Sequence, residues 1–396
     1  MKWKRLTIGD HCTVTSSKRF HISDRSSHGV PFYCSKEIIQ MFNGEQVDET
    51  DYISEDAYEQ IKKRYGIPKE GDLLITTRGT LGIPYLYKRN DRFYFADGNL
   101  TWLKDFDDEL SAEYLYYWLQ SYTGKKKIEA IAKGTAQKAV PISAIQDLII
   151  EAPNVHHQLE IIDKILPYDR LIKSNRLQIK LLEEAAQRLY KEWFIDHHFP
   201  GYENVKIVDS IPEGWNIRKL ADVADIIMGQ SPTSDTFNLN RNGLPFHQGV
   251  GSYGNRYVKN KVYTTSYTRI ANADSILFSV RAPVGRLNVT KNKIVIGRGL
   301  AAFNQKQGYQ NYLFYMLKEH YFKDDLIGNG SIFSSITKNE LMNQKFIIPD
   351  TKTMLAYDNI AKIIDKKIDN LDCQIDLISE ARNRLLPKLM SGEIEI

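Results

Sequence analysis

The sequence predicts an α/β (α+β) protein built as a tandem repeat, in which two similar α/β domains are joined by two long helices. Three observations lead to this prediction. The C-terminal parts of the two halves align without gaps at a separation of 196 residues, from Gly134 over Gly330 to Phe194 over Met390. Each aligned part carries a seven-residue apolar repeat. The segment before each part mixes short β-like runs with one helical run, which indicates one fold used twice.

The repeat is clearest where residues 178–189 lie over residues 374–385, because seven of these twelve positions are identical. Upstream the similarity weakens, but the residues that mark one turn recur in both halves. Arg78 follows a short apolar run and precedes Gly82, and Arg281 stands in the same way before Gly285. Both stretches are typical of a buried strand that enters a turn.

The aligned parts are predicted to be helices that pair with each other as an antiparallel coiled coil around a pseudo-two-fold axis. Apolar residues recur in an a/d pattern over three to four heptads, which is typical of a coiled-coil seam. The seam of the first helix consists of Ile165, Tyr168, Ile172, Asn175, Ile179, Leu182, Ala186, Leu189 and Trp193, and that of the second includes Ile364, Ile368, Leu371, Ile375, Ile378, Leu385 and Leu389. Two separate amphipathic helices, each packed on its own domain, remain the alternative.

Prolines suggest where these helices begin and end. Pro153 and Pro349 precede them, while Pro200 and Pro387 are expected to limit their ends. Pro167 is expected to bend the first helix or separate its opening turns. The predicted domains are therefore residues 1–153 and 201–349, with helical spacers at 154–200 and 350–396. Within the domains we expect helices at 112–119 and 311–317, and strands at 73–75, 93–95 and 293–296.

Composition excludes several classes of protein. The 396 residues contain 53 basic and 49 acidic side chains, a net charge of +4, so the chain is no polycation. Ordinary apolar and charged fractions of 42% and 26% argue against wholesale disorder. Three widely separated cysteines without a Cys-x-x-Cys pair favour a reducing cytoplasm over a disulfide framework or a zinc site. No apolar run approaches the ~20 residues of a membrane span, so no membrane association is expected.

The small net charge conceals an uneven distribution. Residues 1–153 contain 21 basic and 22 acidic side chains, a net of −1, whereas residues 201–349 contain 18 and 11, a net of +7. Seven acidic residues between positions 45 and 59 account for the acidity of the first domain; without them it carries +6. Both domains thus combine basic residues with polar loop residues, which suits contact with phosphates and base edges. On charge alone, a solvated mixed-charge surface is about as good an explanation.

Four groups of loop residues are candidates for DNA binding. Arg78 and Arg281 follow strands and can bridge phosphates or pair with guanine, although an ion pair inside the domain is an equal alternative. Lys133, Thr135, Gln137 and Lys138 form a polar basic loop whose Gln can pair with adenine, and Asn329 and Ser331 stand in the corresponding loop of the second half. Lys125 and Lys126 belong to a basic cluster that is more often a solvated face. The fourth group surrounds a glycine-rich stretch and consists of Gln248, Ser252, Tyr253 and Arg256.

No catalytic motif accompanies these candidates. The Gly249–Gly254 stretch matches G-x-G-x-x-G, but no helical pattern follows it, as a dinucleotide site requires. The sequence contains no G-x-x-x-x-G-K-[ST] phosphate loop and no Asn-Pro-Pro-Tyr or Asp-Pro-Pro-Tyr tetrapeptide of amino-methyltransferases. Pro349-Asp350 with Asp365 and Lys367 imitates a nuclease motif, but the last two positions fall on a predicted helix. The chain is therefore expected to bind DNA without being an enzyme and without holding a metal or cofactor.

Several peptides give the chain a resemblance to a known family. Ile211–Trp215, Lys219–Ala224 and Met228-Gly229-Gln230-Ser231-Pro232 resemble the opening of a target recognition domain in the specificity (S) subunit, HsdS, of type I restriction–modification systems. Leu386–Ile394 resembles the C-terminal signature of that family. With the duplication, the resemblance covers essentially the whole chain. The first domain departs from the family pattern because it lacks a Gly-Gln-Ser-Pro stretch.

The resemblance implies a function and a set of partners. Each domain would read one half of an asymmetric bipartite target in double-stranded DNA, and the coiled coil would set the gap between the halves. Two modification subunits would carry S-adenosylmethionine and methylate adenine N6, and two restriction subunits would carry the nuclease and the ATP- and Mg²⁺-dependent motor. The alternatives are a coiled-coil adaptor and a fused DNA methyltransferase or nuclease.

Overall fold

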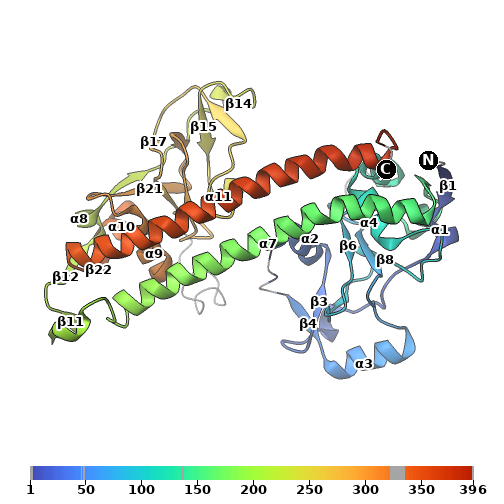
Figure 1. Ribbon diagram of the computed structural model, residues 1–396, viewed down its shortest axis with the longest axis horizontal. Helices are drawn as coiled ribbons and strands as arrows, with labels where there is room; N and C mark the ends of the chain where they lie inside the picture. The colour runs from blue at the N-terminus through green and yellow to red at the C-terminus, as the bar shows by residue number, and fades with distance from the viewer. Residues whose placement is uncertain (1–2, 46, 48–49, 135–137, 322–334, 395–396) are drawn as a thin grey trace. The chain divides into compact units, whose positions relative to one another are not determined.

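The computed structural model describes residues 3–45, 47, 50–134, 138–321 and 335–394. They form two compact units: unit 1 comprises Met1–Lys173 with Asp376–Ile396, and unit 2 comprises Ser174–Ile375. Each unit combines one α/β domain with one portion of each of two long helices, α7 (Val155–Phe194) and α11 (Thr351–Met390) (Figure 1). Among the described residues, no helix has both the length and the apolar character needed to cross a membrane.

The described residues of unit 1 form three small sheets. A four-stranded antiparallel sheet has the order β2-β8-β5-β6, a three-stranded sheet has the order β4-β3-β7, and β1 pairs with β9. The strands are β1 (Lys4–Thr7), β2 (Thr13–Thr15), β3 (Val30–Tyr33), β4 (Asp51–Ile53), β5 (Leu73–Thr76), β6 (Pro84–Leu86), β7 (Tyr94–Phe95), β8 (Leu100–Lys104) and β9 (Ile149–Ala152). The helices are α1 (Ile8–His11), η1 (Ile22–Asp24), α2 (Ser35–Asn43), α3 (Glu55–Arg64), α4 (Ala112–Gln120), α5 (Tyr122–Ile131) and α6 (Ile142–Gln146).

Unit 2 repeats this plan with additional strands. Its four-stranded antiparallel sheet has the order β13-β21-β18-β19, its five-stranded sheet has the order β14-β16-β15-β20-β17, and β12 pairs with β22. The strands are β10 (Ile207–Val208), β11 (Ile211–Pro212), β12 (Asn216–Lys219), β13 (Ala224–Met228), β14 (Phe237–Asn238), β15 (Leu244–His247), β16 (Val262–Thr264), β17 (Ile270–Ala271), β18 (Ile276–Ser279), β19 (Leu287–Val289), β20 (Ile294–Ile296), β21 (Leu300–Gln305) and β22 (Lys345–Ile348). The helices are η2 (Tyr202–Asn204), α8 (Leu220–Val223), η3 (Ser234–Thr236), η4 (Val250–Ser252), α9 (Gln310–Tyr321) and α10 (Lys338–Asn343).

The helix expected within each domain is present as α4 and α9, and the expected strands are present as β5, β7 and β20. Ser111 caps α4 by accepting a hydrogen bond from the Tyr114 amide at 3.4 Å, as a serine N-cap does. Every residue of α9 from Tyr312 to Leu317 is buried, so this helix is enclosed on all sides. β7 and β20 each begin one residue later than the apolar runs suggest.

The long helices bury one row of the predicted seam fully and much of the rest in part. In α7 the five positions of the first row, Ile165, Ile172, Ile179, Ala186 and Trp193, are all at most 7% exposed. Within unit 2 the two helices run antiparallel, because Asn175 donates to Gln374 at 3.1 Å and the Tyr357 hydroxyl donates to the Ala186 carbonyl at 2.9 Å. A polar contact from a buried asparagine, here Asn175, favours one register between helices.

Two expectations about where prolines interrupt the helices were wrong. Pro167 does not separate the opening turns of α7, because it lies inside one continuous helix, and Pro387 lies inside α11, which continues to Met390. A proline inside a helix removes one backbone hydrogen bond, and packing of the apolar face can outweigh that loss. In unit 1 that packing includes the buried residues Ile161, Ile162, Ile165, Leu386 and Leu389.

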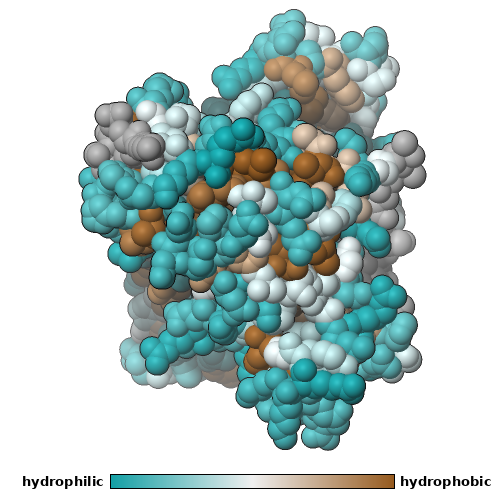
Figure 2. Space-filling model, turned by 90° about the vertical axis from the view of Figure 1, so that its right-hand side faces the viewer, coloured by the Kyte–Doolittle hydropathy of each residue, from teal (hydrophilic) through white to brown (hydrophobic). Residues whose placement is uncertain are grey.

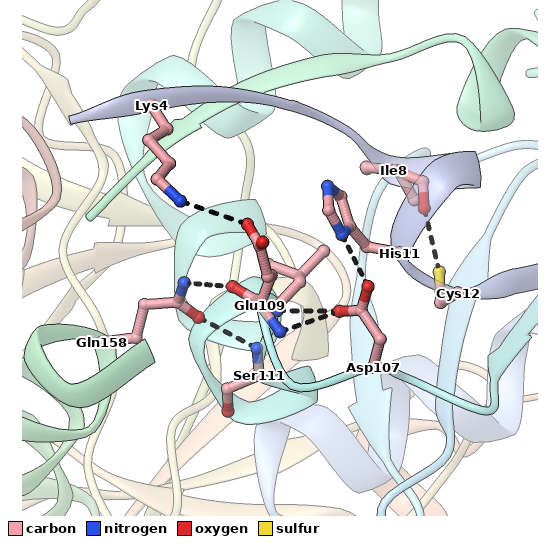
Figure 3. A network of polar contacts seen from close by, with 9 residues as sticks. Lys4, Ile8, His11, Cys12, Asp107, Glu109, Ser111 and Gln158 are labelled. Carbon is pink, nitrogen blue, oxygen red and sulfur yellow. Dashed lines mark hydrogen bonds and ion pairs between the residues drawn. The ribbon is translucent and has the colours of Figure 1, made fainter. Parts of the chain in front are cut away.

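A polar network joins the start of α7 to the domain of unit 1 (Figure 3). The side chain of Gln158, which is fully buried, donates to the Glu109 carbonyl at 2.8 Å and accepts from the Ser111 amide at 2.9 Å. Asp107 accepts from His11 at 2.8 Å, and Lys4 pairs with Glu109 at 3.4 Å. These contacts fix the loop before α4 against both α7 and the N-terminal strand.

Candidate nucleic-acid interface

Arg78 occupies a defined place at the end of β5, which pairs with β8 and β6 in the four-stranded sheet of unit 1. The Gly82 amide bonds back to the Thr76 carbonyl at 2.7 Å, and Gly82 has a φ of +75°, a conformation that favours glycine. The backbone of Arg78 forms an isolated antiparallel β-bridge with that of Ala139. The Val140 amide donates to the Thr77 carbonyl at 2.9 Å. The chain on the far side of the predicted basic loop is thus tied directly to the end of this strand.

These segments line a cavity of about 270 Å³ in unit 1. Arg78 and Lys133 both line it, and both side chains are exposed. Neither forms an ion pair with any residue that the structure describes. Its other lining residues are Ser16, Thr77, Gly98, Leu100, Thr101, Ala139, Val140, Pro141 and Ile142. Two unpaired cations at one concave surface make a site for an anion such as a phosphate.

Unit 2 places Arg281 in the same way at the end of β18. The Gly285 amide bonds to the Ser279 carbonyl at 2.9 Å, and Gly285 has a φ of +91°. The Arg281 side chain is exposed, and the backbone of Arg281 forms an isolated β-bridge with that of Ser335. The Ile336 amide donates to the Val280 carbonyl at 3.0 Å. The equivalence of Arg78 and Arg281, inferred from the Arg-x-x-x-Gly spacing, therefore holds in backbone pairing as well.

The Gly-Gln-Ser-Pro stretch of unit 2 packs against the turn before β21. The Ser231 hydroxyl donates to Oε1 of Gln248 at 2.8 Å, and the Arg298 amide donates to the Ser231 oxygen at 3.2 Å. A Cβ on Gly229 would lie 2.1 Å from the Gly297 carbonyl oxygen, so glycine is required there. The result is a tightly packed corner from which the exposed side chains of Gln248 and Arg298 project.

The first domain fills the corresponding corner with cations. Strand register establishes the equivalence, since Thr15 pairs with Trp102 as Ile227 pairs with Ala302. Lys18 and Arg19 consequently stand where unit 2 has Gln230 and Ser231. Arg19 pairs with Asp97 at 2.7 Å and remains 70% exposed. Sequence reasoning missed both residues, although their place after the first strand, level with the missing motif, was a usable signal.

Two predicted DNA contacts were wrong. Arg256 is 3% exposed, and its guanidinium lies 2.5 Å from the carboxylate of Asp365 on α11. The hydroxyl of Tyr253 is buried without a hydrogen-bond partner among the described residues, and burial raises the pKa of this phenol. Both side chains point into unit 2 because the glycine-rich loop folds back on the domain. The prediction that these two side chains face a DNA partner rested on loop composition alone.

The remaining candidates have different surroundings. Lys138 is exposed close to the cavity, whereas Lys125 and Lys126 lie on α5, where Lys126 pairs with Glu129 at 3.4 Å. The Ser252 hydroxyl lies 2.7 Å from Nδ1 of His247, so it is partly engaged inside the domain. Thr135, Gln137, Asn329 and Ser331 lie outside the described residues.

His247 holds the glycine-rich loop from both sides. Its Nε2 lies 2.9 Å from Oδ1 of Asn260, and burial lowers the pKa of the imidazole below its ordinary value. The neutral ring therefore donates from Nε2 to Asn260 and accepts the Ser252 hydroxyl proton at Nδ1. This arrangement keeps Gln248, the next residue along the chain, at the surface corner.

On the face shown in Figure 2, hydrophobic residues form several small areas separated by hydrophilic ones. The two units are thus similar α/β domains, each with an exposed arginine at the matching strand end.

The chain belongs to the family of the type I restriction modification DNA specificity domain, whose model matches residues 1–184 and 212–386. It is 30% identical over 335 residues to the "Putative type I restriction enzyme MjaX specificity subunit" of Methanocaldococcus jannaschii, covering 82% of this chain and 79% of that protein. The MjaIX specificity subunit of the same organism is 24% identical over 87% of this chain and 82% of its own length. The resemblance seen in the sequence is thereby confirmed.

A solved structure shares the fold. The S subunit of a type I restriction–modification system from M. genitalium has a TM-score of 0.57 and 15% identity, with 98% of this chain and 96% of that chain covered. At this identity the likeness establishes the fold alone. It agrees with the two α/β domains and two long helices described above.

Proposed function

We propose that this chain is the DNA-recognition subunit of a type I restriction–modification complex. Each domain reads one half of an asymmetric bipartite target, and the helices set the gap between the halves. The observation that carries the proposal is the repeated placement of an exposed arginine, Arg78 and Arg281, at the same strand end of two diverged domains. The family membership supports the same conclusion.

Under this proposal the two kinds of contact have separate roles. Arg78 and Lys133 meet the phosphates, because an unpaired cation at a concave surface binds a backbone oxygen without regard to sequence. The surface corner of unit 2, with Gln248 and Arg298, offers an amide and a guanidinium that can meet base edges in the major groove. The two domains differ in these corner residues, so the two half-sites differ.

Catalysis belongs to the partners under this proposal. Two modification subunits would supply S-adenosylmethionine and methylate adenine N6, and two restriction subunits would supply the ATP- and Mg²⁺-dependent motor and nuclease. The chain itself would act in the cytoplasm without a cofactor. No membrane would be involved.

A map of methylated adenines tests the proposal. We expect a host that carries this chain with its modification partner to methylate one bipartite sequence, and a host that lacks this chain to leave that sequence unmodified. Absence of any sequence-specific methylation with both subunits present would favour a coiled-coil adaptor. Methyl transfer by the purified chain alone would show a fused enzyme.

A further inference from the structure

Each unit contains a carboxylate at the same position of the long helices. Asp169 on α7 and Asp365 on α11 are 196 residues apart and correspond in the repeat. Each accepts a hydrogen bond from a tyrosine on the helix of its domain. Tyr117 of α4 donates to Asp169 at 2.7 Å, and Tyr315 of α9 donates to Asp365 at 2.9 Å.

The arginine that neutralises the carboxylate comes from a different element in each unit. In unit 1 it is Arg382 of α11, whose Nη1 lies 2.6 Å from Asp169. The repeat places Ala186 at the position of Arg382, so α7 offers no cation to Asp365. In unit 2 the arginine is Arg256, which belongs to the glycine-rich loop of the recognition domain.

Arg256 is held by its surroundings as well as by the ion pair. The centre of its guanidinium lies 3.4 Å from the ring centroid of Phe314, and its carbonyl accepts the Val289 amide at 3.0 Å. One turn further along α11, Asp369 pairs with Lys291, which lies over the ring of Tyr257 at 4.4 Å. The loop and the turn after β19 are thus bound by charge to one face of α11.

We infer that Arg256 is a positioning residue: through Asp365 it fixes the glycine-rich loop of the second recognition domain on α11, and so narrows the range of gaps that the protein accepts between half-sites. This inference rests on the proposed function. A buried ion pair cannot slide or open without leaving an uncompensated charge in a dry environment. The glycine-rich loop that follows Gln248 is therefore held in register with the helix. In unit 1 the equivalent charge pair, Asp169 with Arg382, joins the two long helices and involves no loop of the recognition domain.

The experiment uses the complex of this chain with its modification subunits and a set of DNA targets. The two half-sites are those obtained from the methylation map, and only the gap between them varies. We expect the wild-type complex to prefer one gap length. In the double variant Arg256→Gln with Asp365→Asn, both charges are removed together while hydrogen-bonding groups remain. The preference for the correct gap over its neighbours should fall by about tenfold, the loss expected for one well-made ionic hydrogen bond.

The matched control is Asp169→Asn with Arg382→Gln, which makes the same chemical change in unit 1. We expect it to leave the gap preference unchanged. A second test variant, Lys291→Gln, removes a pair that is 39% exposed on the lysine side and so carries little risk of misfolding. It should relax the gap preference in the same direction by about twofold.

The outcomes separate positioning from simple stabilisation. If the double variant binds all targets less well but keeps the wild-type gap preference, Arg256 only stabilises unit 2 and the inference is overturned. The same holds if the control relaxes the preference as much as the test variant does. If the wild-type complex shows no gap preference and no bipartite target, the proposed function fails, and the inference fails with it.

Discussion

Arg78 and Lys133 provide the sharpest test of how the first domain meets DNA. Both are exposed, both line the same cavity, and neither is paired with a described residue. Replacing both by Gln removes two cations without changing a packed side chain. If each one neutralises a phosphate, each loss reduces the slope of log K against log salt by about 0.9.

The magnitude follows from that slope. Between about 50 and about 200 mM salt the logarithm of concentration changes by about 0.6, so one phosphate contact accounts for about a 3.5-fold change in affinity. Two contacts account for about 12-fold. We therefore expect the difference between wild type and the double variant to shrink by about 12-fold over this range, and by about 3.5-fold for each single variant.

The assay is a fluorescence-anisotropy titration of the specific target with the complex at several salt concentrations. Lys62→Gln is the matched control, because Lys62 is an exposed lysine of the same domain that pairs with Glu59 at 3.4 Å. Lys62→Gln removes one positive charge, as each single variant does, but at a site away from the cavity. It should leave the slope near the wild-type value. A double variant with the wild-type slope would refute the assignment of the cavity to phosphate. A slope lowered equally by Lys62→Gln would show that only net charge matters.

Three further results are expected. Arg281→Gln should weaken binding through the second half-site by about tenfold and leave recognition of the first half-site intact. Binding to targets mutated in one half at a time measures the two effects separately. Loss of recognition of both half-sites would contradict independent domains. The stability of unit 2 should fall as pH drops below about 6.5, because His247 is then protonated in the unfolded chain, whereas its lowered pKa keeps it neutral in the folded form. Thermal melts between pH 7.5 and 5.5 should therefore show a larger fall in melting temperature for wild type than for His247→Gln. Equal falls for the two proteins would exclude this cause. Removing seven residues from each long helix at facing positions shortens each helix by about 10 Å. The gap between the half-sites of the methylated target should then shorten by about three base pairs, with the half-sites unchanged. A map of methylated adenines measures both.

Much of the fold could be predicted because its signals are local or periodic. The seven-residue repeat of Ile165, Ile172 and Ile179 specifies which face of α7 is buried, and the structure buries that face. The equivalence of Arg78 and Arg281 was also readable, since a short apolar run followed by Arg-x-x-x-Gly describes one turn in both halves. Glycine at a positive φ is what makes that turn recognisable.

The site was only partly predictable, because exposure depends on contacts far apart in sequence. Arg256 and Tyr253 have the same local composition as a surface loop, yet Arg256 pairs with a residue 109 positions away. Lys18 and Arg19 were overlooked for a similar reason. Their equivalence to Gln230 and Ser231 of unit 2 follows from strand register, and register is set by pairing between distant segments.

The sequence by itself determined the duplication, the apolar seam of the long helices and the family to which the chain belongs. These properties are written in spacing and identity along the chain, and they hold whatever the distant contacts are. Tertiary structure alone decided which cations are exposed without an ion pair and which are used inside the protein. A side chain's charge is available to a partner only if no carboxylate reaches it first, and folding brought Asp365 to Arg256 while the described residues around Arg78 and Lys133 bring none.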